Sequence, residues 1–263
     1  MSALAPTGVR APVPRRGVGR WLSGYLHMLR FEAASQRDWL PLLLVVELLI
    51  GAGMAIMYGF YVSSVPPRLA AFIVTGTPAL ALFPVGFVML PTAIARRKLA
   101  GSYDYVRSLP APHSATIAAT ASLYTVLVIP GAAVSLAVAS WRYGVALHIS
   151  PMIVPAVLLT SLTAASAGAA IGHGVRDPMV TSLIGNLIIF VVLLYTPVAF
   201  PPQQYPAWLV HLHELLPFYN MAIVLRAALS VGLVADVGRS YAILAAWTIA
   251  GLAFAGWIAS RRR

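Results

Sequence analysis

Few side chains in this sequence are of a kind that could do chemistry, and several of them lie in one polar stretch between two apolar runs. Residues 96–112, RRKLAGSYDYVRSLPAP, contain the only lysine, Lys98, and an aspartate between two tyrosines. Ser102 is a good helix N-cap, Asp104 falls in the first turn where the helix dipole favours an anion, and the prolines after Leu109 would end a helix. A loop that only reverses the chain needs about four to six residues. The stretch is therefore predicted to form a short helix with a role of its own, with a plain solvated loop as the alternative.

A single carboxylate, Glu47, falls inside an apolar run long enough to cross a membrane. An ionisable group at such a depth is a functional candidate by default. Glu47 could line or gate a substrate path together with Asn186 and Tyr195. It could instead be protonated and hydrogen-bonded to a neighbour such as Asn186, as a structural polar contact.

The sequence H-L-H-E, with His211, His213 and Glu214, raises the question of a metal site. It differs from H-E-x-x-H, in which both histidines share one face of a helix. Side chains two residues apart on a helix point in different directions, and the apolar neighbours of this stretch indicate a helix. No metal site is therefore predicted, and the imidazoles are expected at the membrane interface. The absence of cysteine also excludes thiolate sites and disulfides.

The composition indicates which kind of secondary structure positions the candidate residues. Of the 263 residues, 60% are hydrophobic and only 10% are charged, whereas a soluble domain carries about 25% charged residues. An apolar stretch of about 20 residues can span a bilayer as a helix. We expect an all-α membrane protein with six transmembrane helices, at residues 40–62, 69–95, 114–140, 151–173, 179–200 and 240–260. Three prolines, Pro78, Pro84 and Pro91, are expected to kink the second span.

The basic residues predict the orientation of these spans. With the N-terminus in the cytoplasm, 14 of the 18 Arg and Lys residues fall on the cytoplasmic side, as the positive-inside rule requires. Both termini are then cytoplasmic. Residues 1–19 are predicted to be a disordered basic arm, and residues 20–263 to be one transmembrane domain.

Two further helices are expected outside the six spans. In residues 20–31, RWLSGYLHMLRF, apolar side chains gather on one helical face and polar side chains on the other, which predicts an amphipathic helix in the cytoplasmic interface. Residues 218–234 are apolar but would reach only about 25 Å as a helix. Arg226 at their centre would cost roughly 2.5–3.5 kcal/mol to insert. This segment is predicted to be an interfacial or re-entrant helix on the outer side.

Two motifs resemble those of ABC-2 type transporter permeases. The first resembles the family's cytoplasmic loop and matches it at Gly101, Ser102, Asp104, Val106, Ser108, Leu109 and Pro110. The second resembles the end of the fifth span and the segment after it, with matches at Pro197, Phe200, Pro201, Pro206, Trp208, Leu209 and Pro217, followed by Arg226. The chain departs from the family pattern at Arg96, Arg97 and Lys98, where acids are frequent, and at Leu216, where asparagine is usual.

The resemblance implies a coupling role for the polar stretch. The helix at residues 101–109 would dock into a groove of a separate ATPase, with Gly101, Ser102, Tyr103, Asp104, Val106 and Arg107 as coupling residues. The amphipathic helix at 20–31 would belong to the same contact. A P-loop needs G-x-x-x-x-G-K-[ST], and Lys98 follows Arg97 instead. The chain is thus expected to be no enzyme and to bind no cofactor, with ATP and Mg held by the partner ATPase.

The expected function is that of the permease subunit of an ABC exporter in the bacterial inner membrane, of the efflux or multidrug-resistance kind. Its cargo would be amphipathic: a drug, an antibiotic, a peptide or a lipid. A second permease copy or a similar chain, the ATPase and membrane lipid are the expected partners, and nucleic acid is not. The alternatives are a proton-coupled secondary transporter using Glu47 and an intramembrane enzyme using the outer histidines, which lacks a convincing nucleophile or metal set.

Overall fold

The computed structural model describes residues 17–38, scattered positions between 41 and 60, residues 65–101 and residues 112–261, and these form helices and no strands. The predicted all-α fold is confirmed for this part of the chain. The elements are α1 (Val18–Gln36), α3 (Pro67–Pro84), the π-helical turn η1 (Val85–Met89), α4 (Leu90–Leu99), α6 (His113–Tyr143), α7 (Ile153–Gly174), α8 (Pro178–Tyr195), the 3-10 turn η2 (Pro202–Gln204), α9 (Ala207–Leu215), α10 (Pro217–Leu229) and α11 (Val237–Arg261).

Five helices in the described ranges are long and apolar enough to cross a membrane: Pro67–Leu99, Ser114–Tyr143, Ile153–Gly174, Pro178–Tyr195 and Val237–Ile258. They coincide with five of the six expected spans. The sixth, 40–62, lies largely outside the described residues. The prediction that the span starting at 179 reaches residue 200 is wrong, because α8 ends at Tyr195 and Thr196 is extended. Pro197 explains this end, since a proline disfavours the helical conformation of the residue before it.

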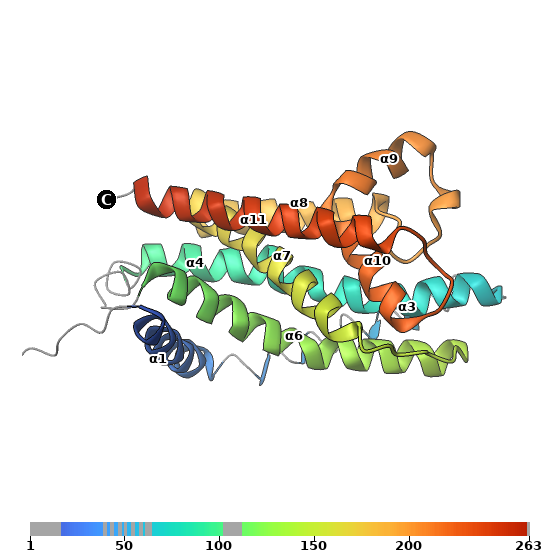
Figure 1. Cartoon of the computed structure of the whole chain (residues 1–263), viewed down its shortest axis with the longest axis horizontal. Helices are drawn as coiled ribbons and strands as arrows, with labels where there is room; N and C mark the ends of the chain where they lie inside the picture. Colours follow the sequence, from blue (N-terminus) through green and yellow to red (C-terminus); the bar gives the residue numbers. More distant parts are fainter. Residues whose placement is uncertain are drawn as a thin grey trace, which may run out of the picture.

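The helices run roughly along one axis, and the two ends of the bundle differ (Figure 1). One end carries α1, the end of α4, the start of α6, the end of α7 and the C-terminal end of α11. The opposite end carries α9 and α10. The end of α4, the start of α6 and the last helical residues of α11 therefore share one end, as the alternation of spans predicts.

The amphipathic segment 20–31 lies within α1, which packs along α6. Met28 and Glu32 are buried against the bundle, whereas Leu22 and Leu26 are exposed. The predicted apolar face is thus divided into a part that contacts protein and a part that does not.

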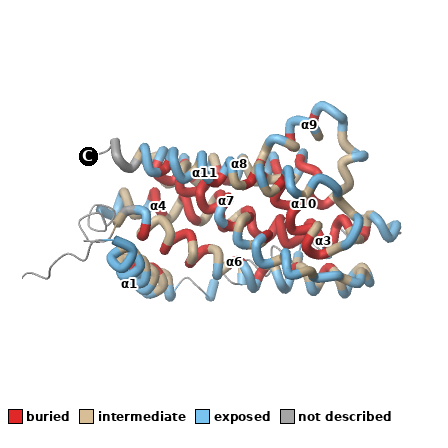
Figure 2. The backbone as a smooth tube through the Cα atoms, in the orientation of Figure 1, coloured by how far each residue is buried: buried red, intermediate tan, exposed pale blue. Residues whose placement is uncertain are grey.

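The most buried elements are α3, the start of α4, α7 and α10 (Figure 2). Phe83, Phe87 and Phe218 form an aromatic cluster where α3, η1 and α10 meet, with ring centroids 4.9–6.4 Å apart. Because most of the α10 side chains are buried, this helix lies inside the bundle. Of the two alternatives for residues 218–234, the burial of α10 supports the re-entrant helix.

The long second span is interrupted at the π-helical turn η1, which separates α3 from α4. Pro84 ends α3 and Pro91 lies in the first turn of α4, so the turn is bracketed by two residues that lack a backbone N–H. Pro78 lies within α3, which remains α-helical around it.

Candidate functional site

The predicted coupling stretch leaves the bundle at Gly101. Gly101 has φ +69°, a left-handed conformation that glycine adopts without strain, and it follows the last helical residue Leu99 by two positions. The other predicted coupling residues, Ser102, Tyr103, Asp104, Val106 and Arg107, lie outside the described residues. The structure therefore fixes the base of this stretch, between the end of α4 and the start of α6.

A buried ion pair holds this base to the N-terminal helix. Both guanidinium NH2 groups of Arg97 donate to the two carboxylate oxygens of Glu32, and the Thr120 hydroxyl of α6 donates to Glu32 Oε1 at 2.7 Å. The Glu32 side chain is fully buried and that of Arg97 is 19% exposed. Bidentate charge-assisted bonds fix geometry as well as charge. One carboxylate thus joins α1, α4 and α6.

Two further contacts extend the seam between α1 and α6. The Trp21 indole donates to Ser114 Oγ at 3.0 Å near the start of both helices, and the Gln36 amide donates to the Tyr124 hydroxyl at 3.2 Å near the end of α1. With Glu32 between them, α1 is tied to α6 along its whole length.

Lys98 makes the second link at this end. Its ammonium group donates to the carbonyl oxygens of Gly172, His173 and Val175, with the last two bonds at 2.9 Å. These carbonyls belong to the last turn of α7 and the residue after it, where helical carbonyls lack intrahelical donors and the dipole favours a cation. The only lysine of the chain therefore caps α7 from the base of the coupling stretch. We call Glu32, Arg97, Lys98 and Thr120 the basal junction.

The position of Glu32 in the sequence is a sign of this junction. Glu32 lies seven positions after Tyr25 and three after Leu29, so a carboxylate falls on the apolar face of an amphipathic helix. A charge at such a position is rarely buried unless it is paired. Arg96, Arg97 and Lys98 also depart from the family pattern, and two of them belong to this junction.

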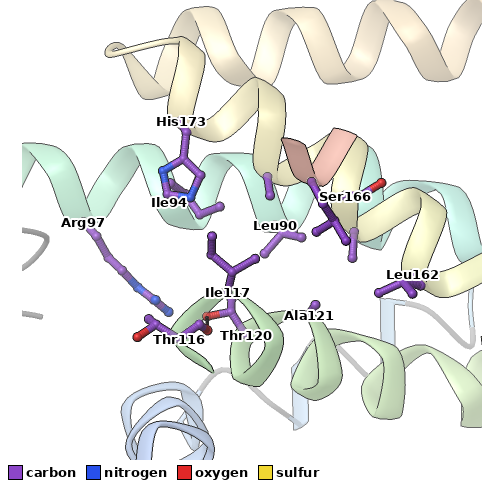
Figure 3. Close-up of a pocket in the computed structure, with 13 residues that line it drawn as sticks. Leu90, Ile94, Arg97, Thr116, Ile117, Thr120, Ala121, Leu162, Ser166 and His173 are labelled. Atoms are coloured by element: carbon purple, nitrogen blue, oxygen red, sulfur yellow. Dashed lines mark hydrogen bonds between the residues drawn. The ribbon is translucent and has the colours of Figure 1, made fainter. Parts of the chain in front are cut away.

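A pocket of about 60 Å³ lies beside the junction, between α4, α6, α7 and α11. Figure 3 shows Arg97 extending from α4 toward Thr116 and Thr120 of α6, while Ile94, Leu90 and Ile117 make the wall apolar. Pockets for drug-sized ligands hold about 300 Å³ or more. This pocket is too small to hold an amphipathic drug.

Of the residues expected to line a pathway, Asn186 and Tyr195 lie in the described part of the chain, and they do not line the same hollow. Glu47 lies outside the described residues. Asn186 lines a hollow of about 370 Å³ with Phe83 of α3 and Met89 of η1, and its amide donates to Ser182 Oγ at 3.3 Å. Tyr195 is 52% exposed at the end of α8, two and a half turns away from Asn186, and does not line this hollow.

The arginine predicted for the outer segment is part of the core. Arg226 of α10 is fully buried, its Nε donates to Thr75 Oγ1 at 3.0 Å, and its Nη2 donates to the carbonyl oxygens of Phe72 and Val198. Its guanidinium lies 4.3 Å from the centre of the Phe72 ring. These partners are uncharged and come from α3 and the segment after α8, so Arg226 fixes α10 to the bundle.

The H-L-H-E residues do not converge. His213 is buried within the protein, with Nδ1 2.8 Å from the Leu209 carbonyl oxygen. Exposed His211 lies on another side, 3.7 Å from Glu214, which also pairs with Arg239 of α11 at 3.5 Å. Within the described ranges, no group of three or more His, Asp or Glu side chains is placed to hold a metal ion.

Comparison with models of known families matches residues 30–230 to the ABC-2 type transporter. The matched region begins within α1 and ends just after α10, so it contains the basal junction and the buried arginine. Comparison with curated protein sequences gives no significant match. Several apolar helices long enough to span a bilayer agree with a multi-pass membrane protein. Since the family match covers most of its length, the chain belongs to the ABC-2 type transporter family, as a membrane permease component.

Proposed function

We propose that the chain is the transmembrane permease subunit of an ABC exporter, which moves an amphipathic substrate with energy from ATP hydrolysed on a separate ATPase. The ATPase, with its ATP and Mg, would dock on residues 101–109. The observation that carries the proposal is the basal junction. It ties the base of this stretch to α1, α6 and α7, which is what a coupling element needs in order to move the bundle.

The junction gives a route for the motion. A displacement of residues 102–111 acts directly on α4 and α6, because these helices adjoin the stretch on either side. Arg97 passes the displacement to α1 through Glu32, and Lys98 passes it to α7 through the three carbonyl oxygens. Charge-assisted hydrogen bonds suit this purpose because they are strong and directional. Four helix ends would therefore move together when the ATPase closes on ATP.

The surface of α8 supports a second permease copy beside the first. Large apolar side chains on this helix are 60–65% exposed, namely Leu183, Leu187, Phe190 and Leu194. A second copy or lipid would cover them, and the substrate path would lie near the axis of the dimer. Asn186, Tyr195 and Glu47 are the residues proposed to line this path. The cargo would be a drug, an antibiotic, a peptide or a lipid, and the chain would lie in the bacterial inner membrane with both termini in the cytoplasm.

The proposal is tested by purifying the chain from its native membrane in mild detergent and identifying what accompanies it. We expect a soluble P-loop protein in near-stoichiometric amount. Replacing residues 102–107 by glycine and serine should remove that protein while the permease still reaches the membrane.

The matched control replaces residues 231–235, which join α10 to α11 at the opposite end, and should leave the partner bound. Recovery of the intact wild-type chain alone, under conditions that preserve other ABC complexes, would contradict the proposal. That result would favour proton coupling through Glu47.

A further inference from the structure

The π-helical turn η1 interrupts the α-helical hydrogen bonding of the long span Pro67–Leu99. Backbone hydrogen bonds in η1 join residues five apart instead of the four of an α-helix, and the Leu90 N–H donates to the Val85 carbonyl oxygen. Single π-helical turns inside α-helices are rare and are frequent at functional sites. Pro84 and Pro91 remove two more N–H donors on either side.

The carbonyl oxygens of this turn face glycines of other helices. Pro91 has no N–H to donate to the carbonyl oxygens of Gly86 and Phe87, which lie five and four residues before it. A Cβ at Gly168 of α7 would overlap the carbonyl oxygen of Gly86, and one at Gly185 of α8 would overlap that of Phe87. Glycine lets these backbones approach closely, and contacts between Cα–H groups and carbonyl oxygens are weak. The carbonyl oxygens of Gly86 and Phe87 are thus covered by neighbouring helices through weak contacts only.

Pro78 lies in the same span, but the carbonyl oxygen that it leaves without a backbone donor has another partner. The carbonyl oxygen that it leaves without a donor is that of Val74, and the Thr77 hydroxyl donates to this oxygen at 2.9 Å. The helix stays α-helical there. A proline alone therefore does not produce the turn, and Pro78 is an internal comparison for Pro84 and Pro91.

The two halves of the span also have different neighbours. Above the turn, α3 packs chiefly against α6 and α10. Below it, α4 packs chiefly against α7 and α8 and carries Arg97 and Lys98 toward the coupling stretch. Val88 and Met89 of η1 line the hollow that contains Asn186 and also a second hollow of about 630 Å³ nearer the basal junction. A change of angle at η1 would move these two side chains relative to both hollows.

We propose that η1 is a hinge, at which α4 turns relative to α3 when the ATPase pulls on the basal junction. The use of the hinge in transport rests on the proposed function, whereas the hinge itself is a property of the fold. Because α4 is about 15 Å long, a turn of roughly 20° would displace its end by about 5 Å. A motion of that size would shift Val88 and Met89 between the two hollows.

The first experiment measures amide hydrogen exchange of the purified chain in lipid nanodiscs. Local opening at a hinge raises exchange above that of the flanking helix. We expect the amides of residues 85–90 to exchange at least tenfold faster than those of residues 70–83. The double variant Pro84→Ala with Pro91→Ala should slow exchange at 85–90 by a similar factor, and the matched Pro78→Ala should not. Equal exchange throughout the span would overturn the hinge.

The second experiment uses the complex purified with its ATPase and compares it without nucleotide and with ATP and vanadate. We expect exchange at 85–90 to change at least threefold while that of residues 70–83 stays constant. In Gly168→Ala the added methyl group would press on the Gly86 carbonyl and suppress this change, whereas Gly256→Ala, with open space around its Cβ, should behave as wild type.

The outcomes separate the two proposals. No change at 85–90 on adding ATP and vanadate to an intact complex would overturn the hinge's role in coupling. If no ATPase accompanies the chain, the proposed function fails, and the first experiment alone decides whether the hinge exists.

Discussion

The change that tests the basal junction most sharply is Glu32→Gln. Glutamine keeps the size of the side chain and an oxygen that can accept from Thr120, but it removes the charge that pairs with Arg97. The substitution therefore isolates the ion pair from the packing around it.

The expected cost follows from burial. Glu32 is fully buried, and the Arg97 side chain is only 19% exposed. Removing one partner of a buried ion pair costs about 3–5 kcal/mol, because the remaining charge loses its counter-ion. The partial exposure of Arg97 places the expected loss near 3 kcal/mol. For a chain of this size, about 3 kcal/mol corresponds to a fall in Tm of roughly 10 °C.

The assay is thermal unfolding of the detergent-purified chain, followed by fluorescence of its tryptophans. The control is Asp38→Asn, which breaks the Arg37–Asp38 pair, whose side chains are 80% and 85% exposed. Exposed pairs contribute little, so this variant should melt close to wild type. A Glu32→Gln protein that unfolds within a degree or two of wild type would refute the reasoning.

Three further changes have expected outcomes. Lys98→Met should lower Tm by about 5 °C in the same melting assay, because the last turn of α7 loses a charged donor. The control Arg96→Met, which replaces an exposed side chain, should leave Tm unchanged. Arg226→Lys should also lower Tm by about 5 °C, since an ammonium group cannot reproduce the planar fork to Thr75 and Val198; an unchanged melting curve would contradict the role given to the guanidinium. Gly76→Ala should destabilise by about 1–3 kcal/mol, because its Cβ would overlap the Val198 carbonyl oxygen, and chemical unfolding should show Gly256→Ala to be close to wild type.

The spans could be predicted because hydropathy over about 20 residues is a local property. Five of the expected spans coincide with helices of the structure. Hydropathy alone extends the fifth predicted span to residue 200, whereas Pro197 disfavours helix at Thr196 and α8 ends at Tyr195. The positions of Pro84 and Pro91 indicated a kink, but periodicity could not show that the backbone would wind into a π-helical turn there.

The contacts of the junction could not be predicted in the same way, because they join residues far apart in the sequence. Glu32 and Arg97 are 65 positions apart, and Lys98 and Gly172 are 74 apart. Arg96, Arg97 and Lys98 look alike in a count of positive charges, yet Arg97 is buried in an ion pair, Lys98 caps a helix and Arg96 is exposed. Only the packing of four helices distinguishes these three residues.

Arg226 shows another limit of prediction from the sequence. Its cost of insertion argues against a further span, but the sequence of an isolated helix gives no information on its partners. Thr75, Phe72 and Val198 supply the hydrogen bonds and the aromatic face that make its burial possible. The charge that opposes membrane insertion of an isolated helix is the group that fixes α10 inside the bundle.

The most direct test of the account is site-specific photo-crosslinking. Because the chain has no cysteine, a single cysteine in Tyr103→Cys carries one crosslinker at the coupling stretch, and Trp141→Cys carries it at the opposite end of the bundle, where the side chain is 82% exposed. After irradiation of native membranes, we expect a covalent adduct with a P-loop ATPase from position 103 and none from position 141. The absence of such an adduct at position 103, or equal yields from both positions, would contradict it.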